Sequence, residues 1–287
     1  MFLISYVQNE KENPVKKTTR ALVISACLST TLTLSALAAN TTATTTAQPV
    51  VQPVAQPQPI ADLTPAQVNQ IQTVIKQYLV SNPEVLVEAA QALQEQQATT
   101  AEKTALSAIK ENKTALFHDP MSPSHGNKSA PVVIVEFFDY QCGHCRAMEP
   151  ILSNLMKGNT HVRMVFKELP IFGGQSKYAA KAALAAHMQP HKYYIFHNLL
   201  LNSTDPLTES TVMTLARSAD IDIKQLKNDM QSPQIDNQLA DNFKLAQALK
   251  LAGTPTFVIS NAAQTKFRYI PGATSAQGLA ADIKAVQ

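Results

Sequence analysis

Cysteine is scarce in this chain, and no charge of one sign dominates it. Its 287 residues include three cysteines, Cys27, Cys142 and Cys145. Small exported proteins that depend on disulfides carry many cysteines spread along the chain, so these three exclude a disulfide framework. The net charge of +3 excludes the strong basic field of a nucleic-acid-binding protein. Beyond residue 37, no run is long and apolar enough to cross a bilayer.

The first 38 residues have the pattern of a secretory signal peptide. A basic stretch ends at Arg20, an apolar run follows over 21–37, and Ala36-Leu37-Ala38 is an A-x-A cleavage pattern. The run is short and diluted by Ser and Thr, which favours cleavage over a membrane anchor. Lipidation of Cys27 is a less favoured alternative, because few apolar residues precede it. We therefore expect an exported protein that retains Cys142 and Cys145.

Two segments separate the signal peptide from the main domain. Residues 39–61 are rich in Thr, Ala, Gln and Pro, which predicts a flexible linker. Residues 62–114 predict a helical extension: Thr64 and Pro65 begin a helix that runs to about Val80, and a second helix follows. The apolar stripes of these helices need a partner, either the following domain or a second copy of the chain.

Residues 115–287 predict an α/β domain with a helical insertion over 176–250. Strands are expected at 131–138 and 161–167 with a helix at 147–157 between them, an order that implies parallel strands. Strands return at 256–260 and 266–270, and a helix over 276–286 ends the domain.

Cys142 and Cys145 lie where the first of these strands meets its helix, in the sequence FFDYQCGHCR. A disulfide between residues three apart closes a very small loop and stabilises little. A zinc site needs about four ligands, and no second C-x-x-C pair is present. The closely spaced histidines lie in a helical pattern, where packed or exposed histidines are ordinary (His187, His191 and His197). Metal binding is therefore the less favoured alternative.

Redox chemistry explains the position of the pair better. Backbone N–H groups at a helix start favour an anion, so Cys142 is expected to be the nucleophilic thiolate. Cys145 is one turn later, within reach of a mixed disulfide formed on Cys142, and is expected to resolve it. His144 between them can lower the pKa of Cys142 by its positive charge or by a hydrogen bond; the alternative is an incidental exposed residue.

The combined motifs resemble the DsbA-like thiol:disulfide oxidoreductases of the bacterial periplasm, which have the thioredoxin fold. The resemblance rests on FFDYQCGHC, on Pro150 within the following helix, and on Gly253-Thr254-Pro255 before a later strand. It implies a cis peptide at Pro255, with Gly253 and Thr254 exposing backbone to a client chain. No cofactor is implied.

Two further expectations come from the same resemblance. Glu136 matches a buried acid of the family that exchanges a proton with the second thiol, here Cys145; the alternative is an acid that faces solvent or pairs with Lys167. Gly143-His144 replaces the Pro-His of the best-known members, which suggests a less oxidising pair able to isomerise wrong disulfides.

The expected function is therefore to form disulfide bonds in exported proteins, with isomerisation as a second activity. The expected partners are client proteins with cysteines and a membrane redox protein that resets the pair. The extension 62–114 resembles the N-terminal dimerisation region of DsbC isomerases, which implies a homodimer through these residues. It also resembles the extension of longer DsbA-like proteins, some of them described as outer-membrane antigens. A dimeric isomerase or reductase is one alternative. A surface or chaperone-like binding protein with a relic redox site is another.

Overall fold

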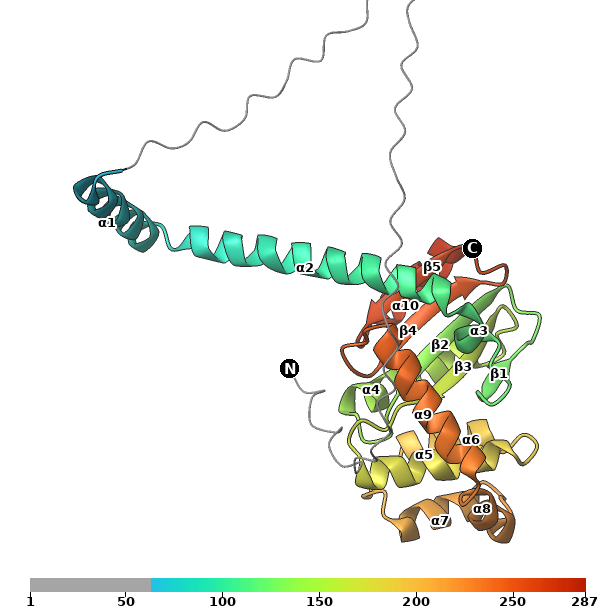
Figure 1. Ribbon diagram of the computed structural model, residues 1–287. Coiled ribbons are helices and arrows are strands. Elements are labelled where there is room, and N and C mark those ends of the chain that lie inside the picture. Colours follow the sequence, from blue (N-terminus) through green and yellow to red (C-terminus); the bar gives the residue numbers. More distant parts are fainter. Residues whose placement is uncertain (1–62) are drawn as a thin grey trace, which may run out of the picture. The chain divides into compact units, whose positions relative to one another are not determined.

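The computed structural model describes residues 63–287 (Figure 1). The predicted signal peptide over 1–38, Cys27 and the predicted linker over 39–61 lie outside the described residues. Among residues 63–287, no helix combines the length and the apolar character that crossing a membrane requires.

A mixed five-stranded sheet in the order β1-β3-β2-β4-β5 forms the centre of the described domain. The strands are β1 (Ser124–Gly126), β2 (Val132–Phe138), β3 (Val162–Glu168), β4 (Thr256–Asn261) and β5 (Phe267–Pro271). Strands β2 and β3 are parallel and the other neighbours are antiparallel. Every residue of β2 is buried, as its continuous apolar run predicts. The sequence did not predict β1, because three residues without an apolar pattern give no strand signal.

Helix α4 (Gly143–Met156) connects β2 to β3, which confirms the predicted strand–helix–strand unit. It begins four residues before the predicted start at Ala147. Cys142 has an extended backbone and is the N-cap, so both thiols belong to the first turn of the helix. Apolar periodicity alone missed this turn, because Gly143 and His144 do not contribute to the apolar face.

Five helices separate β3 from β4 and gather beside one end of the sheet (Figure 1). They are α5 (Gly174–His187), α6 (Tyr193–Leu201), α7 (Glu209–Ser218), α8 (Ile223–Asp229) and α9 (Pro233–Ala248), and α10 (Ala276–Val286) follows β5. One apolar cluster joins α4–α8 and α10 to one face of the sheet. A second cluster joins the end of α9 and three buried residues of 109–117 to the opposite face. Helices on both faces explain why β2 has no exposed side.

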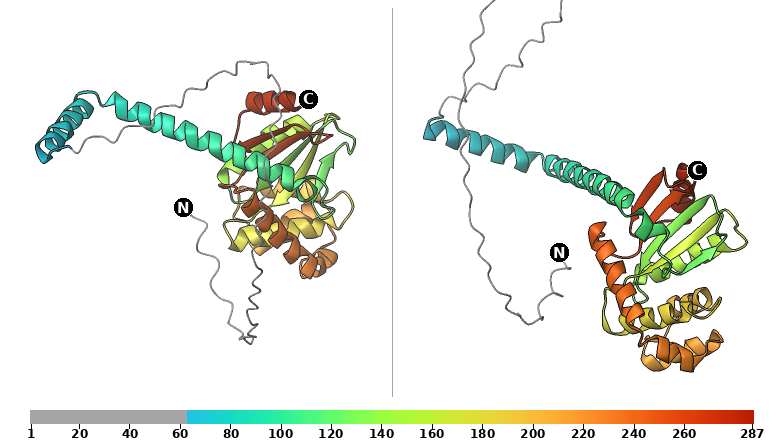
Figure 2. Two further views of the ribbon diagram at one scale, coloured as in Figure 1. Left: turned by 45° about the horizontal axis from the view of Figure 1, so that its top comes forward. Right: turned by 45° about the vertical axis from the view of Figure 1, so that its right-hand side comes forward.

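The N-terminal helices are α1 (Pro65–Ser81), α2 (Glu84–Glu111) and the short α3 (Lys113–Phe117). Thr64 caps α1 as predicted: its hydroxyl accepts from the backbone N–H of Gln67 (3.4 Å), and the Gln67 amide oxygen accepts from the Thr64 N–H (2.9 Å). Helix α1 buries no residue, and α2 buries Ala105 and Ile109 in its last turns, beside β5 (Figure 2). Most of the apolar stripe therefore has no partner within the described domain.

Candidate functional site

Cys142 and Cys145 lie at the carboxyl end of the central strand, where α4 begins. The Cys142 N–H donates to the backbone oxygen of Asp139 (3.1 Å), and the Cys142 backbone oxygen accepts from the N–H of Arg146 (3.0 Å). Both cysteines are free thiols in this structure; Cys142 keeps 5% of its surface exposed and Cys145 keeps none. A partner thiol can therefore approach Cys142 but not Cys145.

The two thiols differ strongly in acidity. A hydrogen bond from the Cys145 thiol is the largest influence that lowers the pKa of Cys142, and it outweighs burial, which raises it. The Thr254 side chain and the backbone N–H groups of Cys145 and His144 add to the lowering, which places the pKa of Cys142 at about 5. The same hydrogen bond, together with burial, raises the pKa of Cys145 far above its usual value. Cys142 is thus the thiolate at neutral pH, and Cys145 is its hydrogen-bond donor.

Thr254 and Pro255 face Cys142 from the loop before β4. The Thr254–Pro255 peptide bond is cis. The protonated Cys142 thiol donates to the Thr254 backbone oxygen (3.2 Å), and the Thr254 hydroxyl is buried without a hydrogen-bond partner among the described residues. Once Cys142 ionises, this hydroxyl becomes a donor to the sulfur. Gly253 precedes this pair, and a Cβ there would contact nothing, so space alone does not require glycine.

Glu136 lies in the middle of β2 with no exposed surface. Neither carboxyl oxygen has a hydrogen-bond partner among residues 63–287. Burial, and then the charges of Glu149 and Cys142, raise the pKa of Glu136 to about 8. The carboxyl group is therefore protonated at neutral pH, and its charge when ionised raises the pKa of Cys145.

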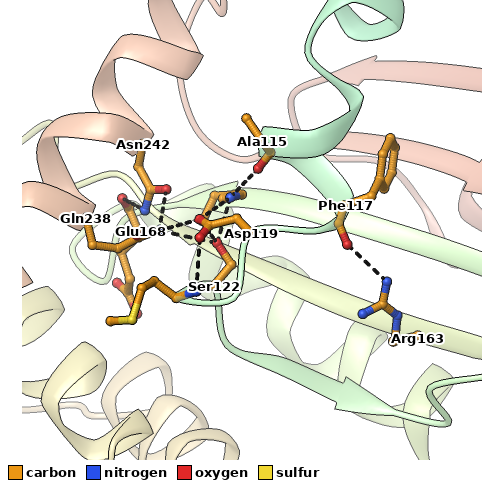
Figure 3. Close-up of polar contacts among 10 residues, drawn as sticks. Ala115, Phe117, Asp119, Ser122, Arg163, Glu168, Gln238 and Asn242 are labelled. Carbon is orange, nitrogen blue, oxygen red and sulfur yellow. Dashed lines mark hydrogen bonds and ion pairs between the residues drawn. The ribbon is translucent and has the colours of Figure 1, made fainter.

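The alternative of a Glu136–Lys167 pair is wrong. Side chains alternate along a strand, and Lys167 is paired in register with Phe137, so it points to the other face of the sheet. There its ammonium donates to Asp119 (2.9 Å), Ser122 (2.6 Å) and the Ala115 backbone oxygen (2.6 Å). Figure 3 labels these three partners.

Gly143 and His144 are both exposed, between the thiols. A Cβ at Gly143 would contact no atom within 4 Å, so its absence is not a requirement of packing. The backbone N–H of His144 is among the groups that lower the pKa of Cys142. An effect of the imidazole on the sulfur remains a prediction.

Sequence reasoning missed Asp139, which shapes the loop before Cys142. Its buried carboxylate accepts from the Gln141 N–H (2.7 Å), the Ser176 hydroxyl (2.6 Å) and the Phe172 N–H (3.1 Å). Asp139 thus ties the thiol loop to α5. Aspartate often forms such turns with the backbone two residues later, and this signal was available in the sequence.

Sequence reasoning also missed a buried polar cluster behind the loop. Glu168 accepts from the hydroxyls of Tyr140 and Tyr193 (both 2.8 Å), and the Tyr140 hydroxyl lies 3.2 Å from Nδ1 of His197. Burial lowers the pKa of His197 to about 3, so this histidine is neutral. No local pattern could have found this cluster, because its members come from different elements.

Two cavities of the described part of the chain lie away from the thiols. Their volumes are about 930 Å³ and 870 Å³, and neither is lined by a cysteine. In residues 63–287, no three His, Cys, Asp or Glu side chains are placed to hold a metal ion.

Comparison with known proteins adds to this geometry. The family model described as DSBA-like thioredoxin domain matches residues 133–284, and that of the copper resistance protein ScsC N-terminal domain matches residues 67–99. BcfH of Salmonella enterica Typhimurium is 31% identical with a TM-score of 0.65, over 77% of this chain and 96% of that chain. Proteus mirabilis ScsC in a transitional conformation is 29% identical with a TM-score of 0.55, over 78% and 96%.

Curated relatives match over shorter parts of the chain. The Na⁺/H⁺ antiporter NhaA 3 of Salinispora tropica is 30% identical over 137 residues, which are 47% of this chain and 21% of that protein. This chain thus spans about a fifth of that relative's length. Probable disulfide bond formation protein D of Bacillus anthracis is 28% identical over 171 residues, which are 55% of this chain and 79% of that protein.

The sequence predicted a thioredoxin-like domain with an N-terminal helical extension, and the strand order, the place of the thiols and the family match all agree with it. Because the family model matches more than half of the residues of this chain, the chain belongs to the family of DSBA-like thioredoxin domains.

Proposed function

We propose that this protein forms disulfide bonds in exported client proteins by thiol–disulfide exchange at Cys142 and Cys145. The observation that supports this most directly is the opposite pKa shift of the two thiols, with Cys142 at about 5. A stabilised Cys142 thiolate is a good leaving group and stabilises the reduced form, which makes the disulfide form an oxidant. Its likeness to a disulfide bond formation protein supports the same direction.

The reaction begins with Cys142 and Cys145 joined as a disulfide. A client thiolate attacks Sγ of Cys142, and Cys145 leaves with the electron pair of the broken bond. A second client thiolate then attacks the client sulfur of this mixed disulfide and releases the Cys142 thiolate. Two electrons pass from the client to this protein, which gains one proton on Cys145 and none on Cys142, and the client's other proton goes to solvent. A membrane redox partner later removes the two electrons. In the reverse direction, Cys145 resolves the mixed disulfide.

Glu136 is proposed to supply the proton that Cys145 needs when it leaves. Its carboxyl group is buried, unpaired and protonated below a pH of about 8. Burial raises the pKa of the Cys145 thiol above its ordinary value even without the Cys142 thiolate, so proton transfer from Glu136 to the departing sulfur is downhill.

The surface beside the thiols suits an unfolded client. Thr254 offers backbone next to the Cys142 sulfur, where an extended client chain can pair with it. Phe172 and Ile171 are exposed apolar side chains on the loop that Asp139 holds, at 59% and 39% of their full exposure. Apolar surface at this place favours chains that have not yet buried their own cores.

Isomerisation is a second candidate, favoured by the helical extension. Val68, Ile71, Ile75 and Tyr78 form an exposed apolar stripe along α1, and Val80 keeps 72% of its surface exposed. We propose that a second copy of the chain covers this stripe and makes a dimer. A dimer can screen its thiols from the membrane oxidant and keep them reduced, which isomerisation requires.

The cysteine assignments are tested by two serine variants. Cys145→Ser should accumulate mixed disulfides with clients, because Cys142 still reacts but no second thiol resolves the mixed disulfide. Dithiothreitol should reduce these mixed disulfides. Cys142→Ser should accumulate none. In cells, the trapped clients should appear in the periplasmic fraction after osmotic shock. A Cys142→Ser protein that still forms disulfides in a reduced client would show that the nucleophile is misassigned.

The acidity of Cys142 predicts how stability depends on pH. Its folded pKa of about 5 lies below the unfolded value of about 8.5. The thiolate therefore stabilises the reduced fold fully above about pH 8.5, and this stability is lost as pH falls through about 5. The oxidised form has no such thiol, so the stability of the reduced form relative to the oxidised form should rise with pH between these limits.

Urea unfolding of both redox forms at several pH values measures this difference. Thr254→Val removes the hydroxyl donor and should narrow the pH range over which the stability of the reduced form relative to the oxidised form rises. Thr254→Ser keeps a hydroxyl and should preserve that range. A difference that does not change with pH would contradict the proposed thiolate.

The proposed role of Glu136 is tested with Glu136→Gln. Removing the acid should slow formation of the mixed disulfide below a pH of about 8, by about 10²-fold, and have little effect above it, where wild-type Glu136 is ionised. The matched control is Glu168→Gln, another buried carboxyl on the same strand pair, which should keep the wild-type pH profile. Equal pH profiles for wild type and Glu136→Gln in stopped-flow kinetics would refute proton transfer by Glu136.

Self-association is tested by sedimentation of residues 39–287. The mass should be that of two copies, and deletion of residues 40–113 should give a monomer that no longer reactivates scrambled ribonuclease. Ile75→Glu should separate the copies, whereas Gln77→Glu, on the opposite side of α1, should not. A monomeric wild type would contradict the proposed self-association. A mass above that of two copies would contradict the dimer and assign a larger assembly instead.

A further inference from the structure

A cavity of about 870 Å³ lies beside the edge strand β1, away from the thiols. It is bordered by β1 with the connections on either side of it, by the start of β3, and by the segment from the end of α5 to the first turn of α6. Arg163 stands at the start of β3, whereas Cys142 follows the end of the parallel strand β2. Arg163 and the thiols are therefore at opposite ends of the parallel strand pair, and none of the residues that line this cavity takes part in the reaction proposed above.

The ionisable side chains around this cavity are mostly basic. Arg163 and Lys128 are permanently charged, and neither forms an ion pair within residues 63–287. The one acid among the lining residues is Asp119, and its carboxylate is already bound by Lys167 (2.9 Å) and Gln238 (2.7 Å). Histidines add further donors to the lining (His118, His125, His187 and His191).

Arg163 has donors that the protein does not satisfy. One terminal nitrogen donates to the Phe117 backbone oxygen (3.3 Å), and the guanidinium stands apart from the Lys167 network (Figure 3). Its Nε is buried and has no hydrogen-bond partner in the described part of the chain. Burial lowers the pKa of Arg163, and no carboxylate acts against this effect. A buried N–H without an acceptor is costly, and a guanidinium presents parallel N–H groups that match an oxyanion.

The walls of the cavity are preformed. His125 stacks on Tyr194 with ring centroids 3.6 Å apart and planes at 9°. Gly126 is paired with Arg163 in register and has a φ of 101°, and a Cβ there would lie 2.6 Å from the Val162 backbone oxygen. Glycine is thus required where β1 approaches the base of Arg163, and this close approach fixes the strand that carries His125.

We propose that this cavity binds a small multivalent oxyanion, phosphate or a polycarboxylate, with Arg163 and Lys128 as its charged ligands. The cavity volume is in the range of small-molecule sites. An oxyanion would accept from the remaining terminal N–H groups of Arg163, which have no acceptor within residues 63–287 besides the Phe117 backbone oxygen, and would neutralise the two uncompensated charges.

Isothermal titration of residues 39–287 tests this at constant ionic strength, with inorganic phosphate in one arm and citrate in the other. At least one should bind with a Kd below about 1 mM. Arg163→Met should weaken binding about tenfold or more, and Lys128→Met should weaken it by a smaller factor. The matched control is Arg217→Met, an exposed arginine on α7, which should bind as the wild type does.

The outcome also identifies the source of the anion. Binding of phosphate alone assigns a phosphate site, and binding of citrate alone assigns a polycarboxylate site. The proposal is overturned if neither anion binds, or if a folded Arg163→Met protein binds as tightly as the wild type. If thermal unfolding shows that Arg163→Met does not fold, the exposed Lys128 decides: unchanged affinity in Lys128→Met overturns the proposal.

Discussion

The coupling between two neighbouring thiols organises the chemistry of this site, because a hydrogen bond from Cys145 is the largest influence that lowers the pKa of Cys142. It makes the more accessible thiol acidic and raises the pKa of the fully buried one, so the two cysteines differ although they lie one helical turn apart. The bond requires Cys142 to be the N-cap of α4, with its sulfur over the first turn. The position of Cys142 depends in turn on β2, because the loop from the carboxyl end of this central strand leads directly to the start of α4. The fold around the thiols therefore serves to hold one donor and one acceptor in a fixed geometry.

Glu136 and Lys167 show how the same sheet treats two buried charges differently. Lys167 lies on the face covered by α3, where an acid, a hydroxyl and a backbone oxygen satisfy its ammonium group. Glu136 lies on the other face and has no partner among the described residues. Such an unpaired acid remains neutral at a cost in stability. The domain tolerates this loss of stability because many apolar side chains pack on both faces of its central strand and stabilise the fold.

What could be predicted from the sequence follows from how local each feature is. The apolar run 132–138 and the helix cap at Thr64 each depend only on residues that are neighbours in the sequence, so β2 and the start of α1 were predicted correctly. The cis peptide at Pro255 was expected only through family resemblance, since no local pattern specifies it. The burial of Glu136 could not be decided, because the helices that cover it follow later in the chain. The polar cluster around Glu168 was not predicted for the same reason, because Tyr140 and Tyr193 donate to Glu168 from separate parts of the chain.

The contact between Cys142 and Thr254 spans 112 positions of the sequence. Because a chain is synthesised from its amino end, the thiol pair is present before the loop of Thr254 has been made. Until β4 joins β2, the Thr254 hydroxyl and the cover over Glu136 are missing, and Cys142 lacks part of what makes it acidic. The part of the acidity that Thr254 supplies is thus acquired only with completion of the sheet. A chain that has not yet paired β4 with β2 therefore carries a less acidic Cys142 than the folded domain does.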